Sequence, residues 1–265
     1  MLEIDDVTLV HNAGRTDEVV ALNGMSLTLP TGQFTTVIGS NGAGKSSLVQ
    51  IVSGAARPTR GRVRLDGVDV TRHGDHRRAG RVSRVFDDPR AGTAPELSIE
   101  DNLALALARG RRRTLRFAVS AERRTLMREH LARLGLGLED RLGDRVGLLS
   151  AGQRQSLTIV MAGLSRPSVL LLDEHLAALD PGTAGRVLDL TRELVEEMGA
   201  TTLMITHNME HALSLGDRLL VLSRGRVIGD LDAATKRETT VGGLVDMITA
   251  SQDAVSDRLL LAERA

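Results

Sequence analysis

The sequence has no cysteine, no tryptophan and no tyrosine, and phenylalanine occurs only at Phe34, Phe86 and Phe117. The absence of cysteine fits a cytosolic protein. Because aromatic rings are so scarce, the hydrophobic core must be built from Leu, Val, Ile, Ala and Met. Lysine is also rare, with Lys45 and Lys236 the only two in a chain whose other basic residues are Arg.

Neither sign of charge is in excess, because 34 Lys and Arg residues balance 34 Asp and Glu residues. The chain as a whole therefore has no electrostatic preference for nucleic acid or anionic lipid. No stretch approaches the apolar length that spans a bilayer, and no signal peptide is expected at the N-terminus. A length of 265 residues predicts one large α/β domain or a domain with an inserted subdomain.

The glycine-rich segment at residues 39–46, GSNGAGKS, is the most informative part of the chain. It fits the phosphate-loop pattern G-x-x-x-x-G-K-[ST] at every specified position. The apolar run 34–38 before it predicts a buried strand, and residues 47–52 after it predict a helix that ends at Gly54. This order of strand, loop and helix is the context that the pattern requires.

The residue types in this loop suit a phosphate chain for physical reasons. Gly39, Gly42 and Gly44 permit positive φ and a close approach, so that backbone N–H groups and the helix N-terminus face the phosphates. We expect Lys45 to neutralise the β- and γ-phosphates and the Ser46 hydroxyl to bind Mg²⁺. The alternative is a glycine-rich turn that opens a helix and binds no ligand.

The segments on either side of this unit predict further strands. Residues 2–10 and 19–29 each predict a strand, the second one broken near Asn23 and Gly24. The Asp66-Gly67 pair, between alternating apolar residues, is a strong hairpin signal. A second hairpin is expected around Arg224-Gly225, and the tail from residue 233 onward predicts amphipathic helix.

The middle of the chain, from Asp87 to about Arg166, is predicted to be mostly helical. Ser98 and Ser120 can each cap a helix there, and a basic patch at residues 109–116 lies between them. We interpret this patch as a solvated surface, because charge runs usually face solvent. The alternative is contact with lipid headgroups or with the cytoplasmic loops of a membrane partner.

Two acidic residues follow a later strand. The apolar run 169–172 predicts a strand buried on both faces, and it ends at Asp173 and Glu174. Downstream of a phosphate loop this is the Walker B arrangement, in which Asp173 would hold Mg²⁺, directly or through water, and Glu174 would orient and deprotonate the attacking water. The alternative is that the two carboxylates only cap a helix.

A further motif completes the series. Residues 149–155, LSAGQRQ, precede the Asp-Glu strand and can begin a helix capped by Ser150. With this motif, the sequence from Leu2 to about Asp230 resembles the ATPase subunit of ATP-binding cassette (ABC) transporters. The order of phosphate loop, signature, Walker B, D-loop and switch histidine is far more specific than any one of these motifs.

The resemblance implies roles for individual residues. The signature, which includes Ser150, would contact the γ-phosphate bound on another protomer, Asp180 of the D-loop would reach across the dimer, and His207 would bond the γ-phosphate and Glu174. His11 is the best match to the usually aromatic adenine platform. The expected catalytic residues are Glu174, His207, Lys45 and Asp180; the expected nucleotide ligands are His11, Gly39, Ser40, Asn41, Gly42, Ala43, Gly44, Lys45, Ser46, Ser47, Ser150, Ala151, Gly152 and Gln153; the expected metal ligands are Ser46, Asp87 and Asp173.

Several positions depart from the family pattern. Asp87 stands where the Q-loop Gln is expected, and a carboxylate there could bind Mg²⁺ more tightly or repel the γ-phosphate. Ala151 replaces a usual Gly, and His175 stands where a small residue or proline is common. Because His11 replaces an aromatic ring, base binding is expected to lose about 1–3 kcal/mol. We therefore expect ATP to bind more weakly than in typical relatives and to turn over slowly.

The fold class that the resemblance implies is α/β, the P-loop NTPase fold of ABC ATPases. It has a mostly parallel core sheet, an N-terminal antiparallel β-subdomain and an inserted α-helical subdomain. The predicted boundaries are residues 1–235 for the ATPase domain, with the helical subdomain at about 87–166, and residues 236–265 for a helical tail.

The function implied is an ATP- and Mg²⁺-dependent ATPase that dimerises around ATP and powers a membrane importer. The stretch 88–95 and Arg111 to Arg113 are similar to importers whose permeases resemble those for branched-chain amino acids, some of them tied to aromatic amino acids. The expected partners are a second copy or a homologous ATPase subunit, membrane permease subunits and an extracytoplasmic solute-binding protein, with no nucleic acid. The protein would lie on the cytoplasmic face of the membrane. The alternatives are a soluble ABC protein of translation or DNA repair, and a degenerate cassette whose nucleotide is regulatory.

Overall fold

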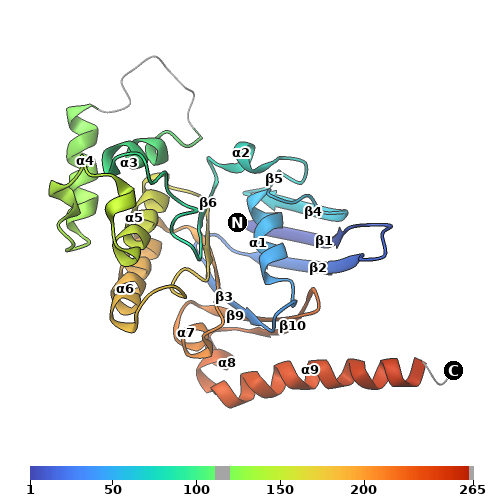
Figure 1. Cartoon of the computed structure of the whole chain (residues 1–265). Helices are drawn as coiled ribbons and strands as arrows, with labels where there is room; N and C mark the ends of the chain where they lie inside the picture. Colours follow the sequence, from blue (N-terminus) through green and yellow to red (C-terminus); the bar gives the residue numbers. More distant parts are fainter. Residues whose placement is uncertain (111–119, 263–265) are drawn as a thin grey trace. The chain divides into compact units, whose positions relative to one another are not determined.

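The computed structural model describes the backbone of residues 1–110 and 120–262, and the side chains of residues 1–110 and 120–251 (Figure 1). The chain folds as two compact units. Unit 1 is Met1–Gly74 with Thr201–Ala265, and unit 2 is Asp75–Ala200. Unit 2 is longer than the helical subdomain expected at residues 87–166, and the boundaries within the ATPase domain stay a prediction.

An antiparallel sheet forms the N-terminal part of unit 1, with the strand order β2-β1-β4-β5. Its strands are β1 (Leu2–His11), β2 (Val19–Leu29), β4 (Arg60–Leu65) and β5 (Val68–Asp69). The hairpin between β4 and β5 turns at Asp66 and Gly67, whose φ angles of 51° and 76° are those that a tight hairpin demands. The predicted interruption of β2 is present as a register shift near Gly24, whose φ is positive.

The second group of strands in unit 1 is β10 (Arg226–Leu231), β9 (Arg218–Ser223), β3 (Phe34–Gly39) and β8 (Thr201–Ile205). Strand β3 pairs in parallel with both β8 and β9, and β10 pairs antiparallel with β9. Every residue of β8 and residues 34–38 of β3 are buried, as continuous apolar and Thr-rich runs predict. Because β3 and β8 are parallel, the segments that follow them leave from the same edge.

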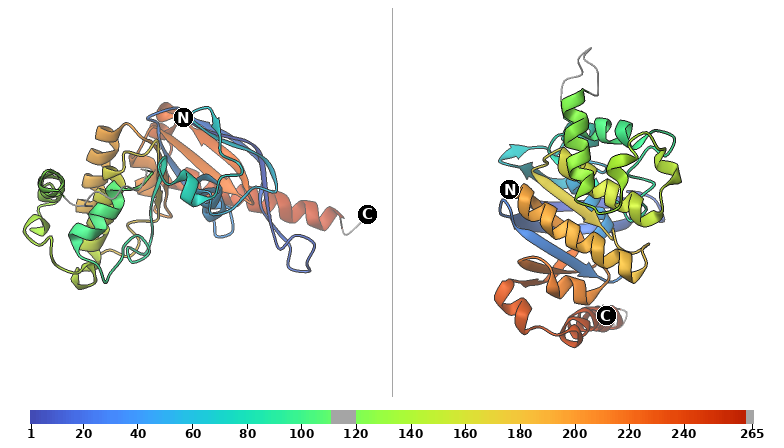
Figure 2. Two further views of the ribbon diagram at one scale, coloured as in Figure 1. Left: turned by 90° about the horizontal axis from the view of Figure 1, so that it is seen from above. Right: turned by 90° about the vertical axis from the view of Figure 1, so that its left-hand side faces the viewer.

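The helices of unit 1 are α1 (Lys45–Ser53), α7 (Met209–Ser214), α8 (Ala233–Glu238) and α9 (Val241–Ala262). Helix α1 begins two residues earlier than predicted and ends, as predicted, at Gly54 in the left-handed conformation. In α9, Leu244 is fully buried in a cluster with Ile38, Leu219 and Val221. The later turns of α9 extend past β9 and β10 toward the C-terminus (Figures 1 and 2).

The second lysine of the chain is a structural residue of unit 1. Lys236 on α8 is 3% exposed, and its Nζ donates hydrogen bonds to the backbone oxygens of Leu215 and Gly216. Burial lowers the pKa of Lys236 to about 8, and the charge of Asp217 acts in the opposite direction. The ammonium therefore ties α8 to the turn that precedes β9.

Unit 2 joins a short parallel pair of strands to a helical bundle. Strand β6 (Val82–Val85) pairs in parallel with β7 (Val169–Asp173). The helical elements are α2 (Asp75–Arg78), α3 (Ile99–Leu107), α4 (Ala121–Ala132), η1 (Leu138–Asp140), η2 (Val146–Leu148), α5 (Ala151–Leu164) and α6 (Pro181–Met198). Leucine and methionine build the core of the bundle; its fully buried members include Ile99, Leu103, Met127, Leu131, Leu138 and Leu157.

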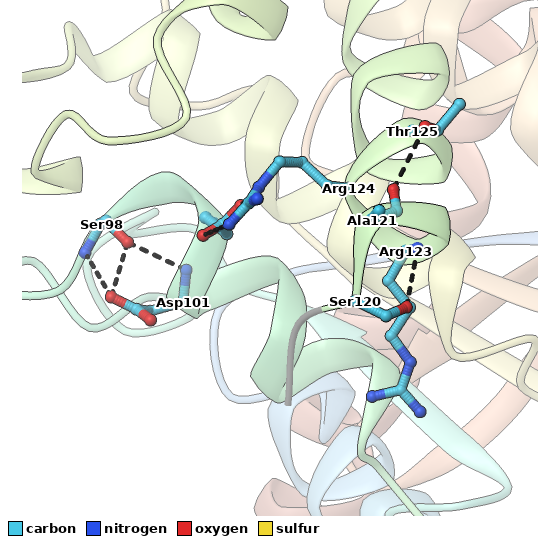
Figure 3. Close-up of polar contacts among 8 residues, drawn as sticks. Ser98, Asp101, Ser120, Ala121, Arg123, Arg124 and Thr125 are labelled. Atoms are coloured by element: carbon cyan, nitrogen blue, oxygen red, sulfur yellow. Dashed lines mark hydrogen bonds and ion pairs between the residues drawn. The ribbon is translucent and has the colours of Figure 1, made fainter. Parts of the chain in front are cut away.

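Two predicted caps begin the first long helices of this bundle (Figure 3). Ser98 accepts a hydrogen bond from the backbone N–H of Asp101, whose carboxylate in turn accepts from the backbone N–H of Ser98. Ser120 caps α4 by accepting from the backbone N–H of Arg123. An ion pair between Arg124 and Glu100 joins α4 to α3 and lowers the pKa of Glu100.

The helical prediction for the middle of the chain was too broad at its start. Residues 87–97 form turns, and the first long helix begins at Ile99. Pro89 and Pro95 explain the difference, because each lacks a backbone N–H and restricts the residue before it. Residues 111–116 of the predicted basic patch lie outside the described residues.

Candidate functional site

The phosphate loop connects β3 to α1 in unit 1, and its glycines have different surroundings. A Cβ at Gly39 would lie 2.3 Å from the backbone oxygen of Leu222, and a Cβ at Gly44 would lie 2.6 Å from that of Ala21. At Gly42 a Cβ would meet no atom within 4 Å. All three have positive φ, between 78° and 158°. The loop is thus packed from behind at both ends and open at its middle, as a phosphate cradle requires.

Neighbouring turns hold the loop in place. The N–H of Gly225, in the hairpin between β9 and β10, donates to the oxygen of Ala43 over 2.9 Å. The oxygen of Gly225 in turn accepts from the N–H of Asn23 in β2. Ala43 itself is 1% exposed. The cradle is therefore a rigid part of unit 1, fixed by two other segments of the chain.

Lys45 lies over this loop. Its Nζ donates to the backbone oxygens of Gly39 at 2.7 Å and Ser40 at 3.2 Å. The ammonium is thus held above the glycine cradle, where it can neutralise phosphate charge. Of the neighbouring residues that were predicted to bind nucleotide, Asn41 and Ser46 are exposed, and Ser47 is half-buried.

The two candidate histidines also belong to unit 1. His207 is exposed and follows β8, the strand beside β3. The N–H of Thr206, just before it, donates to the oxygen of Val37 in β3. His207 and the phosphate loop thus leave the same edge of the sheet. His11 is exposed at the end of β1, where it pairs with Val19.

In unit 2, β7 ends at the two candidate carboxylates. The Asp173 side chain is 12% exposed, and its Oδ2 lies 2.6 Å from the Nη2 of Arg84 in β6. Glu174 is half-buried and has a φ of 47°, which is uncommon for a non-glycine residue. Such a conformation costs free energy, and residues that adopt it are found at functional sites as well as in turns.

Asp87 follows β6, as Asp173 ends β7, so both leave the carboxyl edge of this strand pair. Asp87 is exposed. The part of the chain that the structure describes contains no group of three or more His, Asp or Glu side chains arranged to hold a metal ion. Mg²⁺ does not need such a cage, because it is commonly held by one or two carboxylates together with water and phosphate oxygens. The hydroxyl of Ser46 in unit 1 and the carboxylate of Asp173 in unit 2 are each oxygen donors of a kind that Mg²⁺ accepts.

The signature segment begins α5 with a reciprocal cap. The Oγ of Ser150 accepts from the N–H of Gln153, and the Oε1 of Gln153 accepts from the N–H of Ser150. Ser150 and Ala151 are exposed at this helix N-terminus, which favours anions. A Cβ at Gly152 would lie 2.3 Å from the Cγ2 of Thr183, so a larger residue there would require the Thr183 side chain to shift.

Asp180 has a local structural role. It caps α6, where its Oδ1 accepts from the N–H of Thr183 at 3.0 Å, and hydrogen bonds from Thr183 lower the pKa of Asp180. Pro181 follows at the first helical position, as expected. Whether Asp180 also reaches a second protomer stays a prediction.

The sequence reasoning missed three side chains of unit 2 that adjoin these motifs. Gln155 is 1% exposed, and its Nε2 donates to the backbone oxygens of His175 at 2.7 Å and Phe86 at 3.1 Å. The Nη2 of Arg154 donates to three backbone oxygens that precede Ser150, those of Val146, Gly147 and Leu149. Arg84 is the third, as the partner of Asp173. Each was visible in the sequence only as a polar residue near a motif.

Comparison with known proteins identifies the family. The sequence profile described as "ABC transporter" matches residues 22–177, which is more than half of the chain. The chain belongs to the ABC transporter family. It is therefore an ATPase of the ATP-binding cassette type, as the order of its motifs predicts.

Two relatives are informative. The chain is 43% identical over 223 residues to a tyrosine transport ATP-binding protein of Clostridioides difficile (strain R20291), covering 84% of this chain and 88% of that protein. It is 36% identical over 231 residues to the methionine import ATP-binding protein MetN of Mesorhizobium japonicum, covering 84% of this chain and 60% of that protein.

Solved structures confirm the predicted fold. The dimeric structure of an ATP-binding cassette in a post-hydrolysis state, bound to ADP and Pi, matches with a TM-score of 0.75 and 27% identity. The match covers 88% of this chain and 99% of that one. Among the described helices of the ABC ATPase, none has both the length and the apolar character of a membrane-spanning segment.

Proposed function

We propose that this ABC ATPase binds and hydrolyses Mg-ATP between two copies of itself and thereby powers uptake of a small solute through a membrane permease. The observation that carries the proposal is the phosphate loop: a glycine cradle closed from behind, open at Gly42 and overlaid by the Lys45 ammonium. A loop of this kind before a helix N-terminus suits the β- and γ-phosphates of ATP. The Ser150 helix tip offers a second anion site, which suits the γ-phosphate held by another protomer.

Each of the predicted site residues then has its own role in the reaction. Lys45 and the loop N–H groups bind the phosphates, while Ser46 and Asp173 supply oxygen atoms suited to Mg²⁺. A Mg²⁺ ion held by these oxygens would neutralise negative charge on the phosphates. Glu174 orients the attacking water and accepts its proton, and His207 donates a hydrogen bond to the γ-phosphate. His11 lies against the adenine, and Asp180 extends the site toward the second copy.

An amino acid or a similar small molecule is the best-supported solute. Two relatives carry tyrosine and methionine in their names, and the tyrosine transport protein covers most of this chain. The partners that this function requires are integral permease subunits and an extracytoplasmic solute-binding protein. The ATPase would then act on the cytoplasmic face of the membrane.

Comparison of the wild type with Glu174→Gln tests the proposal. We expect the ATPase activity of Glu174→Gln to be about 100-fold or more below that of the wild type, because general-base catalysis commonly contributes that much. ATP-loaded Glu174→Gln should also elute as a dimer in size-exclusion chromatography, whereas the ATP-free chain should not. Equal ATPase activity in both proteins would contradict the role of Glu174, and a strictly monomeric ATP-loaded variant would contradict the two-copy site.

One observation supports a second candidate function, a low-turnover cassette in which nucleotide is regulatory. Asp87 is exposed where the family has glutamine, and its negative charge would repel a γ-phosphate. Asp87→Gln should then raise ATPase activity. Unchanged activity in this variant would leave the importer function as the better account.

A further inference from the structure

The carboxylate that is proposed to serve Mg²⁺ already has a cationic partner in this chain. Arg84 Nη2 and Asp173 Oδ2 are 2.6 Å apart, and the two side chains are 24% and 12% exposed. Water screens a pair this far from solvent less than it screens a surface pair. In the β6–β7 ladder Arg84 is opposite Leu171, two residues before Asp173, so the guanidinium reaches along β7 to the carboxylate.

The guanidinium is held in place from a second side. Its central carbon lies 4.4 Å from the centroid of the Phe86 ring, which is within the range of a cation–π contact. The backbone oxygen of Phe86 accepts from Gln155, so the segment that carries this ring is itself tethered. The Nε of Arg84 is buried and has no hydrogen-bond partner in the described part of the chain.

The contact with Asp173 uses one nitrogen and one oxygen, rather than the two parallel hydrogen bonds that Arg–carboxylate pairs frequently form. Oδ1 of Asp173 therefore stays outside this contact. A cation bound at Oδ1 would lie close to the guanidinium of Arg84, which contacts the other oxygen of the same carboxylate. The repulsion would reduce its affinity, whereas nucleotide without metal would meet a neutralised carboxylate.

We propose that Arg84 competes with Mg²⁺ for Asp173 and so weakens the dependence of nucleotide binding on the metal. Arg84 is then a positioning residue, which acts on the metal site through Asp173. The inference rests on the proposed function, because it requires Asp173 to face the metal–nucleotide complex.

The test compares nucleotide affinity with and without metal in the full-length chain. Calorimetry with a non-hydrolysable ATP analogue, once in Mg²⁺ and once in EDTA, gives the ratio of the two affinities. We expect Arg84→Met to raise this ratio by about tenfold, because removal of a unit charge near a poorly screened site is worth on the order of 1.4 kcal/mol. Arg84→Lys, which keeps the charge, should stay close to the wild type. Electron paramagnetic resonance with Mn²⁺ should show tighter metal binding in Arg84→Met.

Arg218→Met is the matched control, since it removes another 2.6 Å ion pair, with Asp230, in unit 1. Its ratio should equal that of the wild type. If Arg84→Met does not fold, Arg84→Gln, which also lacks the charge, should show the same rise. An unchanged or lower ratio in the uncharged variants overturns the inference. Wild type that binds the analogue in neither condition contradicts the proposed function itself.

Discussion

Gln155 and His175 are joined by a 2.7 Å hydrogen bond from the side-chain amide of Gln155 to the backbone oxygen of His175. The same amide reaches the backbone oxygen of Phe86. His175 directly follows Glu174, and Phe86 directly precedes Asp87. One buried side chain therefore fixes the backbone beside both the candidate base and the residue at the Q-loop position.

Gln155→Leu should impair stability and catalysis together. Loss of the amide leaves one buried and one partly buried carbonyl group without this donor, so the free energy of unfolding should fall by about 2 kcal/mol. Because the backbone at Glu174 is released, kcat for ATP hydrolysis should fall more than KM changes. Urea titration and steady-state kinetics measure the two effects. Thr158→Val removes the hydrogen bond from its Oγ1 to the backbone oxygen of Gln155, at 2.8 Å, and a longer one to the side-chain Oε1, at 3.4 Å, but it leaves the Gln155 amide in place. It should therefore lower stability with a much smaller loss of kcat; a loss of kcat equal to that in Gln155→Leu would contradict the role of Gln155.

The two reciprocal helix caps allow structure and function to be separated at Ser150. Ser98→Ala and Ser150→Ala each remove one cap, so each should cost about 1 kcal/mol of stability. Only Ser150→Ala should also reduce ATPase activity, because Ser150 is proposed to contact a γ-phosphate. Thermal unfolding and ATPase assays on the two variants provide the comparison. Equal activity in both would place Ser150 among purely structural caps.

The phosphate loop offers a similar pair. Gly42→Ala should lower the free energy of unfolding by about 1–2 kcal/mol, which is the cost of a positive φ at alanine. No steric cost is added, because its Cβ would enter open space. Gly44→Ala adds a backbone clash with Ala21 and should destabilise the protein more. Urea unfolding of the two variants measures the difference. If Gly44→Ala were no less stable than Gly42→Ala, the loop would not be packed as described.

Lys236 should make the stability of the protein rise with pH. Its pKa is about 8 in the folded chain and about 10.4 when unfolded, so between these values the unfolded chain binds the extra proton. The free energy of unfolding therefore rises as the pH increases from about 8 to about 10.4, and the full contribution of Lys236 is present above the unfolded pKa. This contribution is lost as the pH falls toward 8. Because the chain has no Tyr and no Cys, few other groups titrate in this window.

Urea titrations at pH 8 and pH 10 on the wild type and on Lys236→Met measure this effect. The increase in the free energy of unfolding between the two values should be larger for the wild type. An increase of the same size in Lys236→Met would assign the pH dependence to other groups.

Local patterns allowed much of the fold to be predicted. The hairpin at Asp66-Gly67, the caps at Ser98, Ser120 and Ser150, and the helix stop at Gly54 all depend on residues that are close in sequence. The short helix α2 was missed, because four polar residues show no apolar period. The turns at residues 87–97 were predicted as helix although they contain two prolines.

The missed parts of the site depend on residues that are distant in sequence. Arg84 meets Asp173 across 89 positions, and Gln155 meets Phe86 across 69. No period or spacing encodes such contacts, since only the pairing of β6 with β7 and the packing of α5 bring them together. Lys236 is similar: its sequence context is a polar helix, yet tertiary packing buries it.

The placement of the two lysines makes the chain useful for selective labelling. Lys236 is 3% exposed, whereas Lys45 is half-buried over the phosphate loop. Of the two side-chain amines, a mild acylating reagent should therefore modify Lys45 first, and bound nucleotide should protect it. Because acylation removes the ammonium that the phosphates need, the extent of Lys45 modification with and without ATP, measured by mass spectrometry, would report occupancy of the loop.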